Sequence, residues 1–429
     1  MEMLHEFEHC RSSHPVLDLL GSLITDGSAR GSAQLWSAVA RSGTPIVCQV
    51  SGEPRTYQVT YLWRATSSDV GSVSINGAPV WHESAEVLAQ PDGIVGARRM
   101  HSVPGTDVWW RTFKVPSQLR AGYSFVESRM GDPTAGVHAC DPFNSRRWPD
   151  AAPADPPVNG SSALIEPRSY VELPEAPPVL RRARPDAPRG ETTLHRVHSR
   201  LLANTRRVWV WTPPTVATVE AAGLPVLLLH DGWHWTVPGC SIATMMDHLV
   251  SSGAVPPMVV VAQESPSGAR EELACDPRFV DFLTEELLPW VRARWPVTRR
   301  PERTAVAGQS YGGLNAVYSA HRRPDVFGAA ISQSGSFWWP GDTPFGRDAG
   351  RIMRLYAEEP RPSVRFSLDV GLLEGRMVAV NRHLRDVLVA GGHDVRYDEL
   401  VGGHDWLSWG PAMPAAIEAV TAGWGGPSL

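Results

Sequence analysis

The sequence predicts two folded domains, an all-β sandwich followed by an α/β domain with a mostly parallel sheet. The chain has 429 residues, more than a single hydrophobic core usually serves. Its first part shows short stretches in which apolar and polar residues alternate, a period of two that is typical of half-buried strands. Its second part alternates continuously apolar runs with segments of helical spacing, the pattern of a parallel sheet covered on both faces.

The predicted boundaries follow changes of composition along the chain. Prolines and alanines crowd residues 149–188, and such a composition is typical of a linker between domains. We therefore expect an N-terminal extension at 1–30, the sandwich domain at 31–148, a proline-rich linker at 149–190 and the α/β domain at 191–429.

The sandwich domain is predicted from alternating runs that are rich in β-branched and aromatic residues. Asn76 and Gly77 directly follow one of them, and this pair is a hairpin signal because both residues tolerate the positive φ of a tight turn. We expect an immunoglobulin-like sandwich with Trp63, Trp109 and Trp110 in its core. The alternating runs are 59–63, 70–75, 108–115 and 123–126.

The α/β domain is predicted from short apolar runs that show no alternation, because strands buried on both faces need apolar residues throughout. Apolar residues at helical spacing between 279 and 295 predict one of the helices that cover the sheet. The expected strands are 207–211, 225–229, 258–261, 304–307, 329–332, 364–370 and 395–401.

Composition and charge exclude several classes of protein. The residues are 42% hydrophobic and 20% charged with a net charge of -5, which is typical of a globular protein and offers no basic field for nucleic acid. No apolar run is long enough to predict a transmembrane span. Five scattered cysteines lack the close pairs of a zinc or redox site, and the first residues lack the positive charge and apolar run of a secretory signal. We therefore predict a cytoplasmic protein that binds neither nucleic acid nor membrane.

A nucleophile motif lies in the α/β domain. Residues 304–307 form an apolar run that leads directly into Gly308-Gln309-Ser310-Tyr311-Gly312 and then into an apolar helical stretch. In this context Gly-x-Ser-x-Gly is a sharp strand-to-helix turn, whose glycines let strand and helix approach and whose serine hydroxyl is lifted above the sheet. The motif predicts the α/β-hydrolase fold with Ser310 as the catalytic nucleophile.

The other two members of a catalytic triad should follow the nucleophile in the order acid, then histidine. His404 follows the predicted strand 395–401 and is the expected general base. Glu374, in the loop after the strand 364–370, is the preferred acid; Asp369 and a dyad without an acid are the alternatives. Asp405 is expected to stabilise its loop.

Two backbone amides should stabilise the oxyanion of the reaction. One is expected from Tyr311, directly after the nucleophile, and the other from Trp233 in the turn after the strand 225–229, with Gly232 as the second candidate. His230 and His234 lie in the same turn, but without further ligands at a suitable spacing we expect them to be structural and predict no metal site.

Taken together, these segments resemble the enterochelin (enterobactin) esterases of the esterase D-like group of α/β-hydrolases. The resemblance extends to the N-terminal region and covers nearly the whole chain, although the linker is longer than expected for the family. The matching residues are 109–113, 141–144, 229–235, 270–273, 286–289, 308–313, 332–340 and 402–405.

The resemblance implies hydrolysis of the serine-ester bonds of a catecholate trilactone such as enterobactin, free or iron-loaded, for release of iron inside the cell. It implies no cofactor, because iron enters only as part of the substrate. A ferric catecholate is anionic and aromatic, so its pocket should offer arginine and flat aromatic surface. The residues expected to contact the substrate are Trp235, Arg270, Phe337, Trp338 and Trp339, each of which has packing or a solvated position as its alternative.

Two other functions remain open from the sequence. An esterase or acyltransferase that acts on another natural-product ester would have the same fold and triad. A non-catalytic siderophore-binding or carbohydrate-binding protein would be expected to lack Ser310 or His404, and both are present. The oligomeric state is not predicted.

Overall fold

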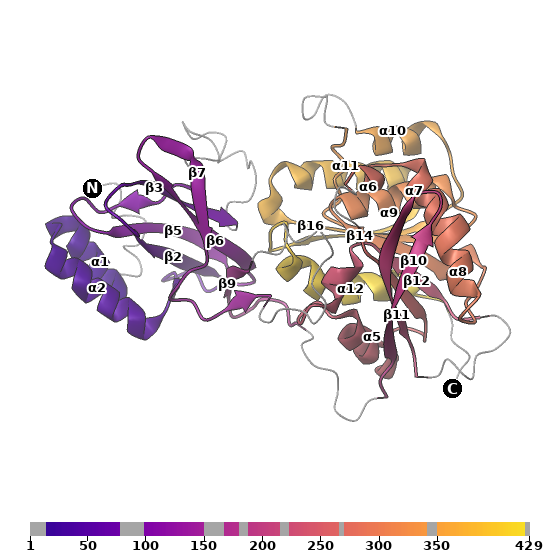
Figure 1. The fold of residues 1–429 in the computed structure, drawn as a ribbon, viewed down its shortest axis with the longest axis horizontal. Helices are drawn as coiled ribbons and strands as arrows, with labels where there is room; N and C mark the ends of the chain where they lie inside the picture. Colours follow the sequence, from indigo (N-terminus) through magenta and orange to yellow (C-terminus); the bar gives the residue numbers. More distant parts are fainter. Residues whose placement is uncertain are drawn as a thin grey trace.

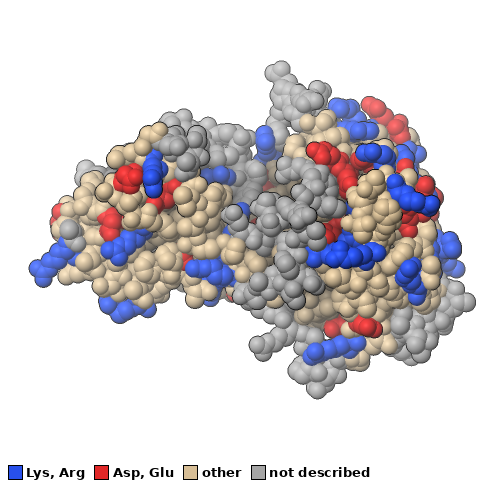
Figure 2. Space-filling model, in the orientation of Figure 1, with Lys and Arg blue, Asp and Glu red and all other residues tan. Residues whose placement is uncertain are grey.

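The computed structural model describes residues 14–77, 98–149, 167–179, 188–214, 223–265, 270–340 and 350–424. Two domains lie side by side (Figure 1), the first in indigo to magenta and the second in magenta to yellow. On the face shown in Figure 2, basic and acidic side chains are interspersed over both domains.

The first domain begins with two helices rather than with a separate extension. Helices α1 (Pro15–Asp26) and α2 (Ala29–Ser42) lie on the outer side of the sandwich (Figure 1). Val16 and Leu20 of α1 are fully buried in one cluster with Trp110 of the sheet. The predicted boundary at residue 30 is therefore wrong, because the apolar stripe of α1 packs on the sandwich.

The sandwich consists of two antiparallel sheets that enclose a core around Val59, Tyr61, Tyr123 and Phe125. Each of the four predicted runs lies in a strand. Strand β9, however, falls in the range predicted as linker; residues 150–166 and 180–187 of that range lie outside the described residues. One sheet contains β1 (Ile46–Gln49), β2 (Thr56–Arg64), β5 (Val108–Pro116) and β4 (His101–Ser102), and the other β3 (Val70–Gly77), β6 (Arg120–Arg129), β9 (Arg168–Glu172), β8 (Arg147–Trp148) and β7 (Asp132–Ala139).

The second domain is built on an eight-stranded sheet that confirms the predicted α/β-hydrolase fold. Its first two strands run antiparallel to their neighbours and the remaining strands are parallel. All seven predicted strands are present. In order across the sheet the strands are β10 (Glu191–Ser199), β11 (Asn204–Thr212), β13 (Val259–Gln263), β12 (Val226–Leu229), β14 (Thr304–Gln309), β15 (Ala329–Gln333), β16 (Arg365–Gly371) and β17 (Asp394–Leu400).

Helices cover both faces of this sheet, and each face has its own apolar core. The predicted helix at 279–295 is a run of α7 (Pro277–Asp281), the π-helical η6 (Phe282–Leu287) and α8 (Leu288–Arg292). This run shares one face with α9 (Tyr311–Arg322), α10 (Arg351–Glu358) and α11 (Arg376–Ala390). The other face is covered by α5 (Ile242–Ser251) and α12 (Trp406–Thr421).

Shorter helical turns complete the domain. They are η5 (Gly232–Thr236), α6 (Arg270–Leu273), η7 (Pro301–Arg303) and η8 (Leu372–Glu374). Within the described ranges, none of the helices combines the length and the apolar character needed to cross a membrane.

Candidate active site

Ser310 occupies the sharp turn between β14 and α9. Its φ of 53° lies in the left-handed region that residues other than glycine rarely adopt. The flanking glycines make the turn possible, because a Cβ atom on Gly308 would lie 2.4 Å from the backbone carbon of Gly312. The Ser310 amide donates to the Gln333 carbonyl of the neighbouring strand at 2.9 Å, which ties the strained turn to the sheet.

An imidazole and a carboxylate follow Ser310 in one hydrogen-bonded chain. His404 Nε2 lies 2.9 Å from Ser310 Oγ, and His404 Nδ1 lies 2.6 Å from Glu374 Oε2. The Glu374 side chain is fully buried, and the His404 side chain is 18% exposed. Since an ionised carboxylate can only accept, Nδ1 carries the proton, and Nε2 is left to accept the proton of Ser310.

The second carboxylate oxygen of Glu374 is fixed from two sides. Glu374 Oε1 accepts hydrogen bonds from Ser334 Oγ at 2.6 Å and from the Gly371 amide at 2.7 Å. A buried carboxylate with these donors is held in one orientation, which in turn orients the His404 ring.

Asp369, the alternative acid, lies inside β16 and takes a different role. Its Oδ2 accepts a hydrogen bond from Gln333 Nε2 at 3.0 Å, and its buried Oδ1 has no hydrogen-bond partner. Burial raises the pKa of Asp369 to about 8; the Gln333 hydrogen bond opposes the rise and the nearby charge of Glu374 adds to it. Asp369 is therefore neutral at pH 7 and does not take the place of Glu374.

Three side chains that the sequence analysis did not single out complete the surroundings of the triad. Trp409 stands edge-on to the His404 ring with centroids 4.8 Å apart, and its Nε1 donates to Ser334 Oγ at 2.9 Å. Ser336 Oγ lies 3.2 Å from Ser310 Oγ. Ser334 and Ser336 follow β15, the neighbour of β14, so their position after a parallel strand was the signal that could have indicated them.

The loop predicted to supply an oxyanion donor lies against the start of α9. Asp231 has a φ of 56°, and η5 begins directly after it at Gly232, where a Cβ atom would meet the Ala262 carbonyl oxygen at 2.4 Å. A Cβ atom on Gly312 would lie 3.2 Å from His230 Cβ. The loop that contains Trp233 and the helix turn that begins at Tyr311 are thus in direct contact.

The predicted substrate-contacting residues separate into two groups. Trp235 is buried, donates to the His230 carbonyl at 3.1 Å and belongs to one sheet core, while Phe337 is fully buried in the other. Their predicted contact with substrate is therefore corrected: both are packing residues. Trp338 and Trp339 are half-buried, and Trp338 lies edge-on to Tyr311 with centroids 5.8 Å apart.

Arg270 begins α6, but its side chain lies outside the described residues. His230 and His234 are buried, and burial lowers their pKa values to about 3 and about 4. His230 Nδ1 lies 3.2 Å from Gln263 Nε2, and His234 stacks on Trp406 at 4.4 Å. Among the residues that the structure describes, no group of three histidine, cysteine, aspartate or glutamate side chains is arranged to hold a metal ion.

A serine on a strand-to-helix turn, hydrogen-bonded to an imidazole that a buried carboxylate orients, defines a serine hydrolase of the α/β-hydrolase class. Comparisons with known proteins agree. A family model described as putative esterase matches residues 199–420, and one described as the N-terminal domain of enterochelin esterases matches residues 58–181. The chain belongs to the enterochelin esterase family and is a carboxylic ester hydrolase.

The relatives match over most of their length. An iron(III) enterobactin esterase of Dickeya dadantii is 31% identical, with 88% of this chain and 90% of the relative covered. The iron(III) enterobactin esterase of Escherichia coli K12 is 30% identical, with 84% and 91% covered. An iron(III) salmochelin esterase of E. coli is 26% identical, with 93% and 96% covered.

Solved structures agree in fold across both domains. The ferric enterobactin esterase of Salmonella typhimurium superimposes with a TM-score of 0.71 at 26% identity, and the match covers 90% of this chain and 98% of that one. The enterobactin esterase of Shigella flexneri, crystallised in the presence of enterobactin, gives a TM-score of 0.70 at 25% identity, with 90% and 97% covered.

Proposed function

We propose that this protein hydrolyses the ester bonds of a catecholate trilactone siderophore of the enterobactin kind, free or loaded with iron(III). The observation that carries the proposal is the Ser310–His404–Glu374 chain of hydrogen bonds in a fold whose two-domain relatives are named enterobactin and salmochelin esterases.

In the proposed reaction His404 Nε2 removes the proton of Ser310 as Oγ attacks a lactone carbonyl. The backbone amides of Tyr311 and Trp233 would hold the oxyanion, and Glu374 would stabilise the imidazolium. His404 then protonates the departing serine oxygen of the substrate, which leaves an acyl-enzyme. Water, deprotonated by the same imidazole, attacks this ester, and the carboxylic acid product leaves as Ser310 regains its proton.

We further propose that the reaction needs no resident cofactor, since a serine triad activates its own nucleophile and iron would enter only within the substrate. The cytoplasm is the proposed location. Within the described part of the chain, Cys48, Cys140, Cys240 and Cys275 are free thiols, which fits a reducing compartment.

The test is a hydrolysis assay with purified enterobactin, with and without iron(III), in which linear products are followed by mass spectrometry. We expect the wild type to release linear serine esters, and Ser310→Ala to lower kcat by about four to six orders of magnitude. Ser336→Ala removes the neighbouring hydroxyl and serves as the matched control; it should keep kcat within about tenfold, since it loses one neutral hydrogen bond. A wild type that leaves the trilactone intact but cleaves other esters would contradict the proposed substrate.

A further inference from the structure

We propose that the sandwich domain positions the catalytic base, and that Asp405 is the positioning residue through which it acts. The inference rests on the proposed function only in taking His404 as the base. The proposed role of the first domain lies in catalysis and applies to every ester substrate. It does not depend on whether the domain also recognises a siderophore.

The contact between the domains is made by the residue next to the base. Asp405 Oδ2 accepts a hydrogen bond from the Gly122 amide of β6, in the sandwich domain, at 3.1 Å. Its Oδ1 accepts from the Ser408 amide at 3.0 Å and from Ser408 Oγ at 3.1 Å. One carboxylate therefore joins β6 to the first turn of α12, with His404 immediately before it in the chain.

Asp405 is half-buried where the two domains meet. Burial raises the pKa of Asp405, and the hydrogen bonds from Gly122 and Ser408 act against the rise, as does the charge of Arg168, a second group of the sandwich domain. Removing a carboxylate oxygen from water is costly unless that oxygen is paired. The sandwich domain supplies the Gly122 donor to Oδ2, so losing this contact would leave Oδ2 without that partner beside the loop of His404.

The path from Asp405 to the triad runs through α12. Asp405 is the N-cap of this helix, whose first turn presents Trp409 edge-on to His404 at 4.8 Å. Trp409 Nε1 donates to Ser334 Oγ, which donates to Glu374. A tilt of this first turn would therefore move Trp409, and with it the contacts of both the base and the acid.

The sandwich domain also packs on the loops of both the acid and the base. Leu373, beside the acid, and Val401, ahead of the base, pack against the apolar core of the sandwich. The two loops are joined to each other, because the Leu373 amide donates to the Gly402 carbonyl at 3.1 Å. The sandwich domain therefore contacts both of the loops that determine the distance and orientation between His404 and Glu374.

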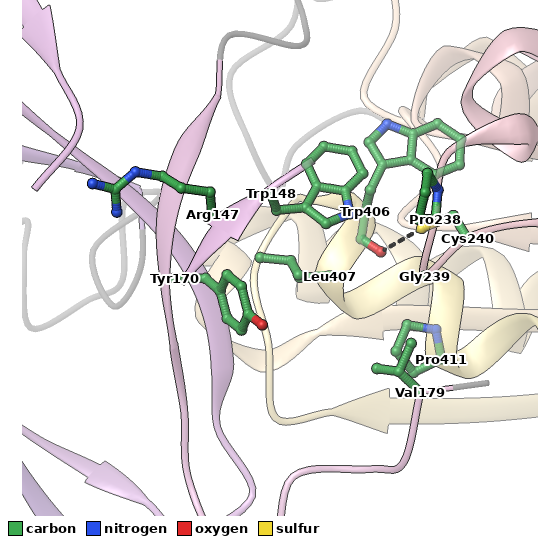
Figure 3. A pocket seen from close by; sticks show the side chains of 10 residues that line it. All are labelled: Arg147, Trp148, Tyr170, Val179, Pro238, Gly239, Cys240, Trp406, Leu407 and Pro411. Atoms are coloured by element: carbon green, nitrogen blue, oxygen red, sulfur yellow. Dashed lines mark hydrogen bonds between the residues drawn. The ribbon is translucent and has the colours of Figure 1, made fainter. Parts of the chain in front are cut away.

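Side chains of both domains also line one pocket where the domains meet. Figure 3 shows Leu407 of α12 between Trp148 and Tyr170 of the sandwich, with Cys240 and Pro411 to the right of them. Side chains from β8, β9 and α12 therefore lie close together on this side of the domain contact.

Asp405→Asn separates this role from helix capping. Asparagine is as good an N-cap as aspartate, so its oxygen can accept from the Ser408 amide. Its NH₂ group then faces the Gly122 amide, donor against donor, and the link to the sandwich is lost. Asp276→Asn is the matched control, because Asp276 caps α7 by accepting from the Arg278 amide and has no part in the triad.

The assay compares the trilactone with p-nitrophenyl butyrate, a small ester that does not need a large binding surface. Rates are normalised to active sites titrated with a phosphonate. For Asp405→Asn we expect kcat to fall by about 10- to 100-fold on both substrates, with KM within about twofold, because a misplaced base slows every acyl transfer. Asp276→Asn should keep the wild-type kcat. Should Asp405→Asn fail to fold, Asp405→Ser gives the same test, since serine caps the helix but is too short to reach Gly122.

Three outcomes would overturn the inference. The first is an unchanged kcat of Asp405→Asn on both esters. The second is a lower kcat on the trilactone alone, which would indicate that the sandwich contributes to substrate binding. The third is an effect on KM rather than kcat. A wild type that cleaves p-nitrophenyl butyrate but not the trilactone would instead contradict the proposed substrate, and Asp405→Asn on the small ester would still decide this inference.

Discussion

Glu374→Gln tests the triad most sharply, because the structure determines how the amide must sit. Glu374 Oε1 accepts from the Gly371 amide at 2.7 Å, and a backbone N–H can only donate. The glutamine oxygen must therefore occupy that position, which turns the NH₂ group toward His404 Nδ1. Facing a donor, Nδ1 must accept, so the ring proton moves to Nε2 and the imidazole can no longer take the proton of Ser310.

We expect Glu374→Gln to lower kcat for two reasons. The imidazole has the wrong tautomer, and the negative charge that stabilises the imidazolium is absent. A mismatch of this kind in a serine triad lowers kcat by about 10⁴-fold, which corresponds to about 5 kcal/mol of transition-state stabilisation. Ser334→Ala, which removes one donor to Glu374 and the acceptor of Trp409 Nε1, should lower kcat by about 10- to 100-fold, less than Glu374→Gln, since a hydrogen bond to a charged group contributes about 1.5–3 kcal/mol.

The assay is steady-state hydrolysis of p-nitrophenyl butyrate, with folding of each variant checked by circular dichroism. Glu374→Gln should match the wild type in secondary structure, because glutamine has the same shape and the site is fully buried. A folded Glu374→Gln variant with more than about a tenth of the wild-type kcat would refute the assignment of Glu374 as the triad acid, since a wrong tautomer cannot support such a rate.

Two further predictions concern the surroundings of the triad. The pKa of Asp369 is about 8 in the folded protein against an ordinary value of 3.8, so the native state keeps a proton that the unfolded chain releases, and stability should fall as pH rises between these values. Asp369→Asn should flatten this decline by up to about 1.4 kcal/mol per pH unit in urea unfolding; an unchanged slope would contradict the neutral form of Asp369. Trp338→Ala should raise KM for the trilactone by about fivefold, because a ring that stacks on a catechol contributes about 1 kcal/mol, and should leave p-nitrophenyl butyrate kinetics unchanged. Equal KM values for the trilactone would show that Trp338 only packs on Tyr311.

Most of the α/β domain could be predicted because its signals are local. Strands β12 to β15 are buried on both faces, so each is a continuous apolar run that stands out from its neighbours. Strand β10 was missed for the opposite reason. It lies at the edge of the sheet and is largely exposed, so its sequence is mostly polar and only its pairing with β11 makes it a strand.

The elements missed in the first domain depend on tertiary contacts in the same way. Strand β9 has five residues and lies within a proline-rich range, but β6 and β8 pair with it on either side. Helix α1 has apolar residues at helical spacing. The prediction of an extension at 1–30 missed this signal because it was based on strand-like runs.

The triad could be predicted because each member follows a strand of one parallel sheet, and the carboxyl ends of parallel strands meet at one edge. Which loop side chains face the substrate could not be predicted. Trp235 and Phe337 lie in loops at this edge, yet both point into the sheet cores, because a short loop directs some side chains inward and others outward and the sequence alone does not say which. The contact of Asp405 with Gly122 joins residues of different domains and has no local signal at all.

The three members of the triad are not equally anchored. Ser310 follows β14, a central strand buried at every position with a neighbour on each side. His404 follows β17, the last strand of the sheet, which pairs only with β16 and has no fully buried residue. Edge strands hold their ends less firmly than central ones, because half of their backbone groups and one of their sides lack a partner in the sheet. A base at the end of such a strand needs support from outside the sheet, and in this protein the first turn of α12 and β6 of the sandwich lie where that support is required.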